Sequence, residues 1–217
     1  LITPVNEHFR QLAAQGVTDV AATPHFYASE NGPDRFLARR ARSWQQLRPH
    51  LTASLPRVHL GAEVLFFEGI AAFDGLPRLC LSGADTLLLE MPFRPWSQRM
   101  LDELLELADR PDVTVLLAHM ERYLPYVAEP DWRRMARSGL YIQSNADFFC
   151  GFSTRRKALR LLSEGRIHVL GTDCHNMERR APRMDEAVRV IARALGDDTV
   201  RRLEEQARRL LERGGAA

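Results

Sequence analysis

The sequence contains no apolar run near the roughly 20 residues that a membrane-spanning helix needs, and it shows no signal-peptide pattern. Cysteine is scarce too: Cys80, Cys150 and Cys174 are the only three in 217 residues. An odd, small number of cysteines in a chain of this length does not make a disulfide scaffold. We therefore expect a protein that works in a reducing, cytoplasmic setting and is not a membrane protein.

An excess of charge of either sign is missing as well. There are 30 Lys and Arg residues against 28 Asp and Glu residues, which gives a formal net charge of +2. Such a balance provides no bulk attraction to nucleic acid or to a membrane surface, so we expect neither as a partner. No repeat or linker divides the sequence. We predict one domain over residues 1–217, with helices from about residue 184 packed on it or extending from it.

What the sequence does contain is a regular alternation of short apolar runs and amphipathic stretches. The apolar runs predict strands and the amphipathic stretches predict helices. This alternation indicates an α/β fold with a mostly parallel sheet or barrel covered by helices. The predicted strands are residues 17–23, 58–64, 86–91, 113–118, 141–144 and 167–172. The predicted helices are residues 6–14, 33–52, 98–109, 131–137, 154–163 and 184–213, the last with a break near residue 196.

A polar or metal-ligating side chain lies at or near the carboxyl end of every predicted strand. In parallel α/β folds these ends gather at one rim, where catalytic and binding residues are found. The recurrence therefore predicts a functional site at that rim. In strand order the residues are His25; Glu63; Glu90; His119 with Glu121 and Arg122; Asn145; and Asp173 with Cys174 and His175.

Each of these residues alone has an ordinary structural explanation. His119 is compatible with a buried core histidine, and Asp173 with His175 is compatible with a polar turn. Glu63 and Glu90 are harder to explain, because an unpaired carboxylate inside apolar sequence is costly to bury. Together, these carboxylates and imidazoles predict a divalent-metal site, with Mn, Fe or Zn favoured by the mixed ligand set. Two or three such ions about 3.5 to 4 Å apart suit phosphoester hydrolysis.

A thiol-based mechanism is the alternative. Cys174 and Arg180 have the C-x5-R spacing of cysteine-dependent phosphatases, and so do Cys150 and Arg156. Arginine is so frequent in this chain that the spacing arises readily by chance. A phosphate-binding loop also needs small residues whose backbone N–H groups converge, whereas the first candidate has no glycine and carries Glu178. The sequence therefore favours metal chemistry over a thiol nucleophile.

The motifs "ATPHF", "GAEV", "LLLEMPF", "AHMERY", "GTDCHN" and "RRAPRM" resemble those of the polymerase-and-histidinol-phosphatase (PHP) superfamily. The order and the residues of these motifs are most similar to those of the metal-dependent tyrosine phosphatases of bacterial capsule and exopolysaccharide operons, over about residues 16–187. The resemblance implies a distorted (β/α)7 barrel with up to three divalent metals, Mn²⁺ being expected. It also implies a phosphotyrosine protein as substrate, namely a tyrosine autokinase of polysaccharide export.

The resemblance implies a role for each matching residue. Six side chains would bind metal, and two arginines would hold the phosphate by bidentate contacts. Glu63 would bridge two metals, Glu90 and His119 would complete one of them, Asp173 would bind the other, His25 with His175 would bind the third, and Arg122 and Arg180 would contact the phosphate.

One feature of the family pattern has no counterpart in this sequence. Family members open with a strand that carries His-x-His, followed by a further histidine, before the helix that corresponds to residues 6–14. We expect an N-terminal truncation, which the absence of an initial Met favours, and hence incomplete metal binding and an exposed sheet edge. The open alternatives are a small-molecule phosphatase of the histidinol-phosphate type and a degenerate, non-catalytic binding protein.

Overall fold

The computed structural model describes residues 2–174 and 182–212. Its strands are all paired in parallel, and most strand-to-strand connections contain a helix, so the predicted α/β class with a parallel sheet is confirmed. Two predicted site residues, His175 and Arg180, lie outside the described residues.

The strands form two sheets. A two-stranded sheet pairs β1 (Asp19–Ala22) with β3 (Arg57–Leu60). A six-stranded sheet has the order β2-β4-β5-β6-β7-β8. Its strands are β2 (His25–Phe26), β4 (Glu63–Leu65), β5 (Thr86–Glu90), β6 (Thr114–Leu117), β7 (Tyr141–Asn145) and β8 (Val169–Gly171).

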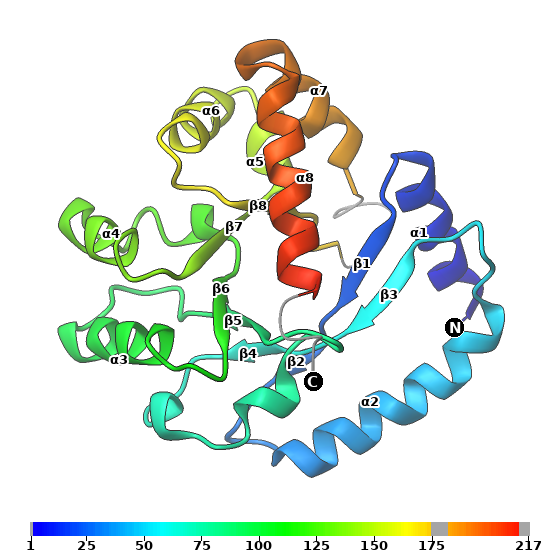
Figure 1. Cartoon of the computed structure of the whole chain (residues 1–217), viewed down its shortest axis with the longest axis horizontal. Coiled ribbons are helices and arrows are strands. Elements are labelled where there is room, and N and C mark those ends of the chain that lie inside the picture. Colours follow the sequence, from blue (N-terminus) through cyan, green and yellow to red (C-terminus); the bar gives the residue numbers. More distant parts are fainter. Residues whose placement is uncertain (1, 175–181, 213–217) are drawn as a thin grey trace.

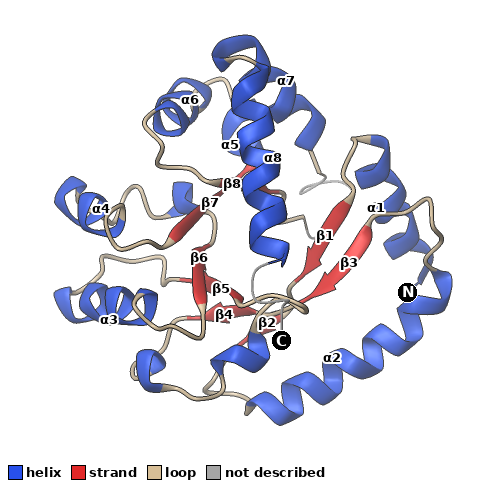
Figure 2. Cartoon of the chain, viewed as in Figure 1, coloured by secondary structure: helices blue, strands red, loops and turns tan. Residues whose placement is uncertain are grey.

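The helices surround the strands in Figure 1 and Figure 2, and α8 passes between β8 and the β1–β3 pair in that view. The α-helices are α1 (Ile2–Ala14), α2 (Pro33–Leu47), α3 (Gln98–Ala108), α4 (Glu129–Met135), α5 (Ala146–Cys150), α6 (Arg155–Ser163), α7 (Met184–Leu195) and α8 (Asp197–Glu212). The described residues also form the 3-10 helices η1 (Arg48–His50), η2 (Ile70–Ala72), η3 (Leu76–Leu79) and η4 (Met120–Arg122).

One predicted strand is divided into two in the structure: the predicted strand 58–64 becomes β3 and β4. The predicted strand 17–23 is β1, and a further short strand, β2, follows it beyond Pro24. Proline has no N–H for a sheet ladder, which separates β1 from β2 at that point. The carbonyl of Pro24 still accepts a hydrogen bond from the Glu63 N–H at 3.1 Å, so the two segments stay side by side. In the next register position, His25 lies opposite Glu63.

The core lies between the six-stranded sheet and the helices that cover it. β5 contributes Leu87 and Leu89, both fully buried, and α3 packs Leu101 and Leu104 onto the same side. Burying an aliphatic side chain of this size stabilises a fold by about 1.5–3 kcal/mol. The carboxyl ends of the strands are thus held by a rigid, close-packed support.

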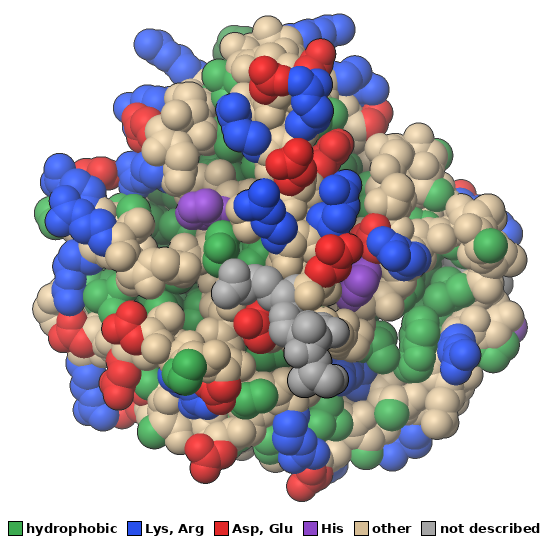
Figure 3. Space-filling view, viewed as in Figure 1, with side chains coloured by type: hydrophobic (Ala, Val, Ile, Leu, Met, Phe, Trp, Pro, Cys, Tyr) green, Lys and Arg blue, Asp and Glu red, His purple; other side chains and the backbone are tan. Residues whose placement is uncertain are grey.

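The last two helices pack against the rest of the chain. α7 contacts α5, and α8 contacts both α7 and β8. The Thr86 hydroxyl at the start of β5 donates a 2.6 Å hydrogen bond to the carbonyl of Leu210 near the end of α8. On the face seen in Figure 3, basic and acidic side chains intermingle, in agreement with the near-zero net charge. None of the helices within residues 2–174 and 182–212 has the length and hydropathy to cross a bilayer.

Candidate metal centre

Three predicted ligands come from three neighbouring strands. His25 begins β2, Glu63 begins β4 and Glu90 ends β5, and these strands are adjacent in the sheet. One ligand atom from each of the three lies within 4.8 Å of the others. Nδ1 of His25 lies 3.9 Å from Oε2 of Glu63. His25 and Glu90 are 65 residues apart in the sequence, and the parallel pairing of their strands brings both side chains next to Glu63.

His119 completes this group, which we call the metal cluster (His25, Glu63, Glu90 and His119). Its Nε2 lies 3.0 Å from Oε1 of Glu63 and 3.1 Å from Oε1 of Glu90. The residue follows β6 and has a left-handed backbone with φ 34° and ψ 59°. Such a conformation is uncommon for residues other than glycine, although histidine adopts it more often than most, and such residues cluster at functional sites.

A glutamine that the sequence did not single out holds this backbone. Oε1 of Gln143, on β7, accepts a 2.5 Å hydrogen bond from the N–H of His119, and its Nε2 donates to Oδ1 of Asn145 at 2.9 Å. Gly171 on β8 leaves room for the glutamine, because a Cβ at that position would collide with its amide. The sequence offered only a weak signal, a glutamine inside a predicted strand, since β7 reads YIQSN and is not a continuous apolar run.

The metal cluster concentrates negative charge in a buried place. Glu63 and Glu90 are 7% and 6% exposed, and His119 is 2% exposed. Burial raises the pKa of Glu90, but the hydrogen bond and charge of His119 outweigh that effect and hold the pKa below its usual range. Burial lowers the pKa of His119, yet its hydrogen bonds to the two glutamates raise it to about 9. An imidazolium thus supplies the positive charge that two buried carboxylates require.

The donor set fits a divalent cation. Two carboxylates and two imidazoles are ligands that Mn²⁺, Fe²⁺ and Zn²⁺ accept, and a dication replaces the proton of His119 with a larger positive charge. Nδ1 of His119 is buried and has no hydrogen-bond partner within the described residues.

Asp173 and Arg122, also predicted for the site, form an ion pair with each other through Oδ2 and Nη2. Asp173 lies just beyond β8 and has a positive φ of 45°. Arg122 ends η4, and its guanidinium carbon lies 5.6 Å from the centre of the Phe93 ring. The structure therefore places a candidate ligand and a candidate phosphate-binding residue in contact.

Two polar residues at the strand ends have a structural role instead. Glu121 accepts hydrogen bonds from the Ser144 hydroxyl at 3.1 Å and from the Asn145 N–H at 3.2 Å. Burial raises the pKa of Glu121. These contacts tie η4 to β7, and Glu121 is not among the carboxylates grouped with His25.

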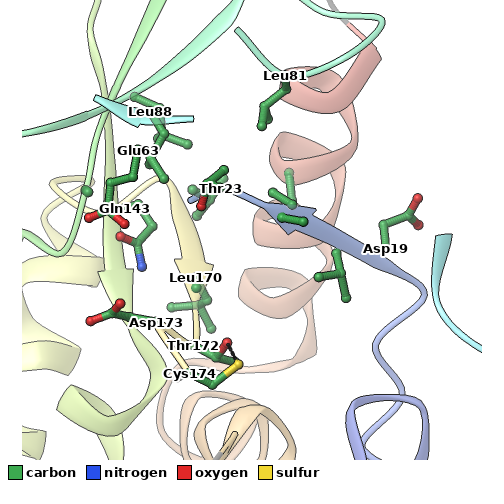
Figure 4. Close-up of a pocket in the computed structure, with 18 of the residues that line it drawn as sticks. Asp19, Thr23, Glu63, Leu81, Leu88, Gln143, Leu170, Thr172, Asp173 and Cys174 are labelled. Carbon is green, nitrogen blue, oxygen red and sulfur yellow. Dashed lines mark hydrogen bonds between the residues drawn. The ribbon is translucent and has the colours of Figure 1, made fainter. Parts of the chain in front are cut away.

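A cavity of about 710 Å³ opens beside the metal cluster. Figure 4 shows Glu63, Gln143 and Asp173 on one side of it and Asp19 on the other, with apolar side chains such as Leu88 and Leu170 between them. Residues of β1 and of β8 both line this space.

The thiols have environments that oppose a nucleophilic role. Cys150 is buried in α5, where its S–H donates to the carbonyl of Ala146, and burial raises its pKa to about 11. Burial also raises the pKa of Cys174, whose sulfur accepts a hydrogen bond from the Thr172 hydroxyl at 3.0 Å. A nucleophilic cysteine needs a depressed pKa, so the metal cluster is the stronger candidate.

Comparison with known proteins gives one negative result and two positive findings. No curated protein matches this sequence. A solved structure from the pair YwqE of Bacillus subtilis and CpsB of Streptococcus pneumoniae, described as unique metal-dependent tyrosine phosphatases, is similar to this chain with a TM-score of 0.82. The match has 21% sequence identity and covers 97% of this chain and 87% of the other, so it establishes a shared fold.

The second finding concerns the sequence family. The family model described as "Capsular polysaccharide synthesis, CpsB/CapC" matches residues 5–212, nearly the whole chain. The match confirms the resemblance expected from the strand-end motifs. The chain belongs to the CpsB/CapC family of capsular polysaccharide synthesis.

Proposed function

We propose that this chain is a metal-dependent phosphoric monoester hydrolase that removes phosphate from phosphotyrosine in a protein of capsule or exopolysaccharide synthesis. Family membership and the fold shared with described tyrosine phosphatases support the proposal. The observation that carries it is the metal cluster, in which two buried carboxylates and two imidazoles converge at the carboxyl ends of parallel strands.

The residues that would hold the metal are those predicted from the strand ends. Glu63 contacts both imidazoles of the cluster, which suits a ligand shared between ions, while Glu90 and His119 lie on one side of it. Asp173 and His175 are further ligands in this proposal, and we expect Mn²⁺ as the ion. When bound, such ions activate water and neutralise the charge on phosphoryl oxygens.

The protein's own groups then bind and orient the substrate. Arg122 carries a permanent positive charge beside the cluster, and its guanidinium fork suits bidentate contact with two phosphoryl oxygens. Arg180 serves as a second such contact in this proposal. The buried setting of Glu63, Glu90 and His119 strengthens each electrostatic interaction, because little water screens them.

We further propose that the two sheets are parts of a distorted (β/α)7 barrel, closed by one more strand between β1 and β8. The cavity lined by both strands has the position that such a first strand requires, and its walls are mainly apolar. The histidines of the family's His-x-His motif would then face the metal cluster. A cytoplasmic location, with a tyrosine autokinase as the substrate protein, completes the proposal; the three free thiols support a reducing compartment.

The direct test is hydrolysis of a phosphotyrosine peptide and of p-nitrophenyl phosphate in the presence of Mn²⁺. We expect phosphate release that EDTA abolishes and that added Mn²⁺ restores. A Cys174→Ser variant serves as the control and should keep its metal-dependent activity. Activity that survives EDTA undiminished contradicts the proposal.

Two other outcomes distinguish the alternatives. Faster turnover of histidinol phosphate than of the phosphotyrosine peptide indicates a small-molecule phosphatase. Tight binding of the phosphotyrosine peptide without phosphate release indicates a non-catalytic binding protein.

A further inference from the structure

An exposed aromatic side chain stands beside the metal cluster. Phe93 is 47% exposed, whereas most large apolar side chains of the described chain are buried or partly buried. Its ring centre lies 5.6 Å from that of His119, and the guanidinium carbon of Arg122 lies 5.6 Å from the same ring. One apolar ring therefore contacts both a candidate metal ligand and the candidate phosphate-binding arginine.

The loop that carries Phe93 is firmly held. The N–H of Met91 donates a 3.0 Å hydrogen bond to the hydroxyl of Tyr123, and Nε1 of Trp96 donates to the carbonyl of Pro92 at 3.1 Å. The rings of Phe93 and Tyr123 stack with their centres 5.8 Å apart and their planes at 19°. Because Tyr123 is fully buried, the exposed ring of Phe93 has a fixed base and loses little entropy when it binds a partner.

A second aromatic ring flanks the other side of the cluster. Tyr27 stacks on His25 with ring centres 5.7 Å apart and an interplanar angle of 14°. Glu63 contacts both His25 and His119, so the contacts run in the order Tyr27, His25, Glu63, His119 and Phe93. The candidate metal ligands thus lie between two aromatic side chains, of which Phe93 is the more exposed.

We propose that Phe93 is a specificity-determining residue that binds the phenyl ring of an aryl phosphate whose phosphoryl group lies at the metal cluster and Arg122. This inference rests on the proposed function and adds the residue that would distinguish aryl from alkyl phosphates. The phenyl ring of an aryl phosphate is one ester oxygen away from phosphorus, which brings it to the rim beside the anion site. Offset-stacked or edge-to-face contact with Phe93 then favours aryl over alkyl phosphates. A phosphoserine side chain has no ring to make this contact.

The test is binding of two non-hydrolysable probes, phenylphosphonate and methylphosphonate, to the Mn²⁺-loaded protein by titration calorimetry. The variant Phe93→Leu keeps apolar volume against Arg122 and removes the ring. We expect the Kd of phenylphosphonate to rise about 3- to 10-fold in this variant, while that of methylphosphonate changes less than about 2-fold. Phe93→Tyr should retain the preference for the phenyl probe. The matched control is Phe152→Leu, since Phe152 is a fully exposed phenylalanine outside the site.

The outcomes separate this inference from the proposed function. A phenyl preference that is unchanged in Phe93→Leu overturns the inference. An equal rise in the Kd of both probes overturns it as well, because it would mean that the ring acts only through Arg122. Absence of a phenyl preference in the unsubstituted protein, including failure to bind either probe, overturns it too. If Phe93→Leu loses the phenyl preference but the unsubstituted protein hydrolyses no phosphomonoester, the binding role of Phe93 is supported and the proposed enzyme activity is contradicted.

Discussion

Two polar clusters take residues from the same two stretches of chain, 17–26 and 57–65, and the metal cluster adds Glu90 and His119 from elsewhere. The two clusters are built in opposite ways. At the start of β1 and β3, Oδ1 of Asp19 contacts Arg57 and His59, each at 2.9 Å; we call these three residues the amino-end cluster. At the other end of the same stretches lies the metal cluster, where Glu63 and Glu90 share His119.

The difference lies in the charge balance. In the amino-end cluster one carboxylate has a permanent cation and an imidazole as partners, and Arg57 is well exposed. In the metal cluster two buried carboxylates, Glu63 and Glu90, face the single buried imidazole of His119. A balanced, partly exposed ion pair contributes modest stability, whereas an unbalanced buried acidic site is suited to binding a cation. We therefore expect the amino-end cluster to contribute to stability and the metal cluster to function, as at the two ends of the strands in other α/β folds.

The largest expected effect comes from neutralising the residue that contacts both imidazoles. Glu63→Gln keeps the shape of the side chain and removes a charge, so we expect Mn²⁺-dependent hydrolysis of p-nitrophenyl phosphate to fall more than about 100-fold. Initial rates over a Mn²⁺ titration measure this. Asp19→Asn is the matched control at the amino-end cluster and should keep activity within about 2-fold. Equal losses in both variants would remove the distinction between the clusters.

A smaller effect is expected for the phosphate-binding arginine. Arg122→Lys retains the charge but loses the guanidinium fork, and we expect kcat to fall about 10- to 100-fold. Mn²⁺ affinity, measured by titration calorimetry, should change little because arginine is not a ligand. A variant with normal kcat and weakened metal binding would show that Arg122 acts only by positioning Asp173.

A substitution in the amino-end cluster should lower the stability of the protein and leave its activity unchanged. Asp19→Asn removes a partly buried charge that is hydrogen-bonded to Arg57 and His59, and we expect the free energy of unfolding to fall by about 1 kcal/mol. Urea denaturation at neutral pH measures the change. Asp34→Asn is the control, because Asp34 pairs with Arg78 at an exposed position and surface pairs contribute little. An unchanged stability in Asp19→Asn would contradict the role assigned to this cluster.

The smallest effect is the pH dependence of that stability difference. Burial raises the pKa of Asp19, but the bonds from His59, Arg57 and Thr18 outweigh it and lower the pKa below its usual range. A lowered folded-state pKa contributes stability that is fully present above the unfolded-state pKa of about 3.9 and is lost as pH falls through the folded-state value. Urea denaturation of the unsubstituted protein and Asp19→Asn should thus give a constant difference from pH 7 to about pH 5. The difference should shrink below about pH 4; a difference that grows there would reverse the sign of the linkage.

The sequence predicts the metal cluster because its residues break local rules. A glutamate inside the apolar run of β5 is costly to bury without a cation, and the same reasoning identifies Glu63. His25 and His119 follow from the rule that the carboxyl ends of parallel strands meet. These inferences need only the order of elements along the chain.

Other features depend on contacts that no local pattern contains. The anchoring of His119 by Gln143 requires β6 and β7 to be neighbours, with Gly171 leaving the room. The predicted strand 58–64 is divided because β3 pairs with β1 in one sheet and β4 pairs with β2 in the other, and hydropathy does not indicate these partners. The helix α5 was not predicted, because its five residues are too few to show a helical period. The place of Phe93 beside Arg122 likewise results from the packing of its loop on Tyr123.

The most direct test of the central claim is anomalous diffraction at the manganese edge from crystals of this protein grown with Mn²⁺. We predict a peak bounded by His25, Glu63, Glu90 and His119, lost in Glu63→Gln, and no peak at Asp19 and His59. No peak at the metal cluster, or one only at the amino-end cluster, would contradict the account.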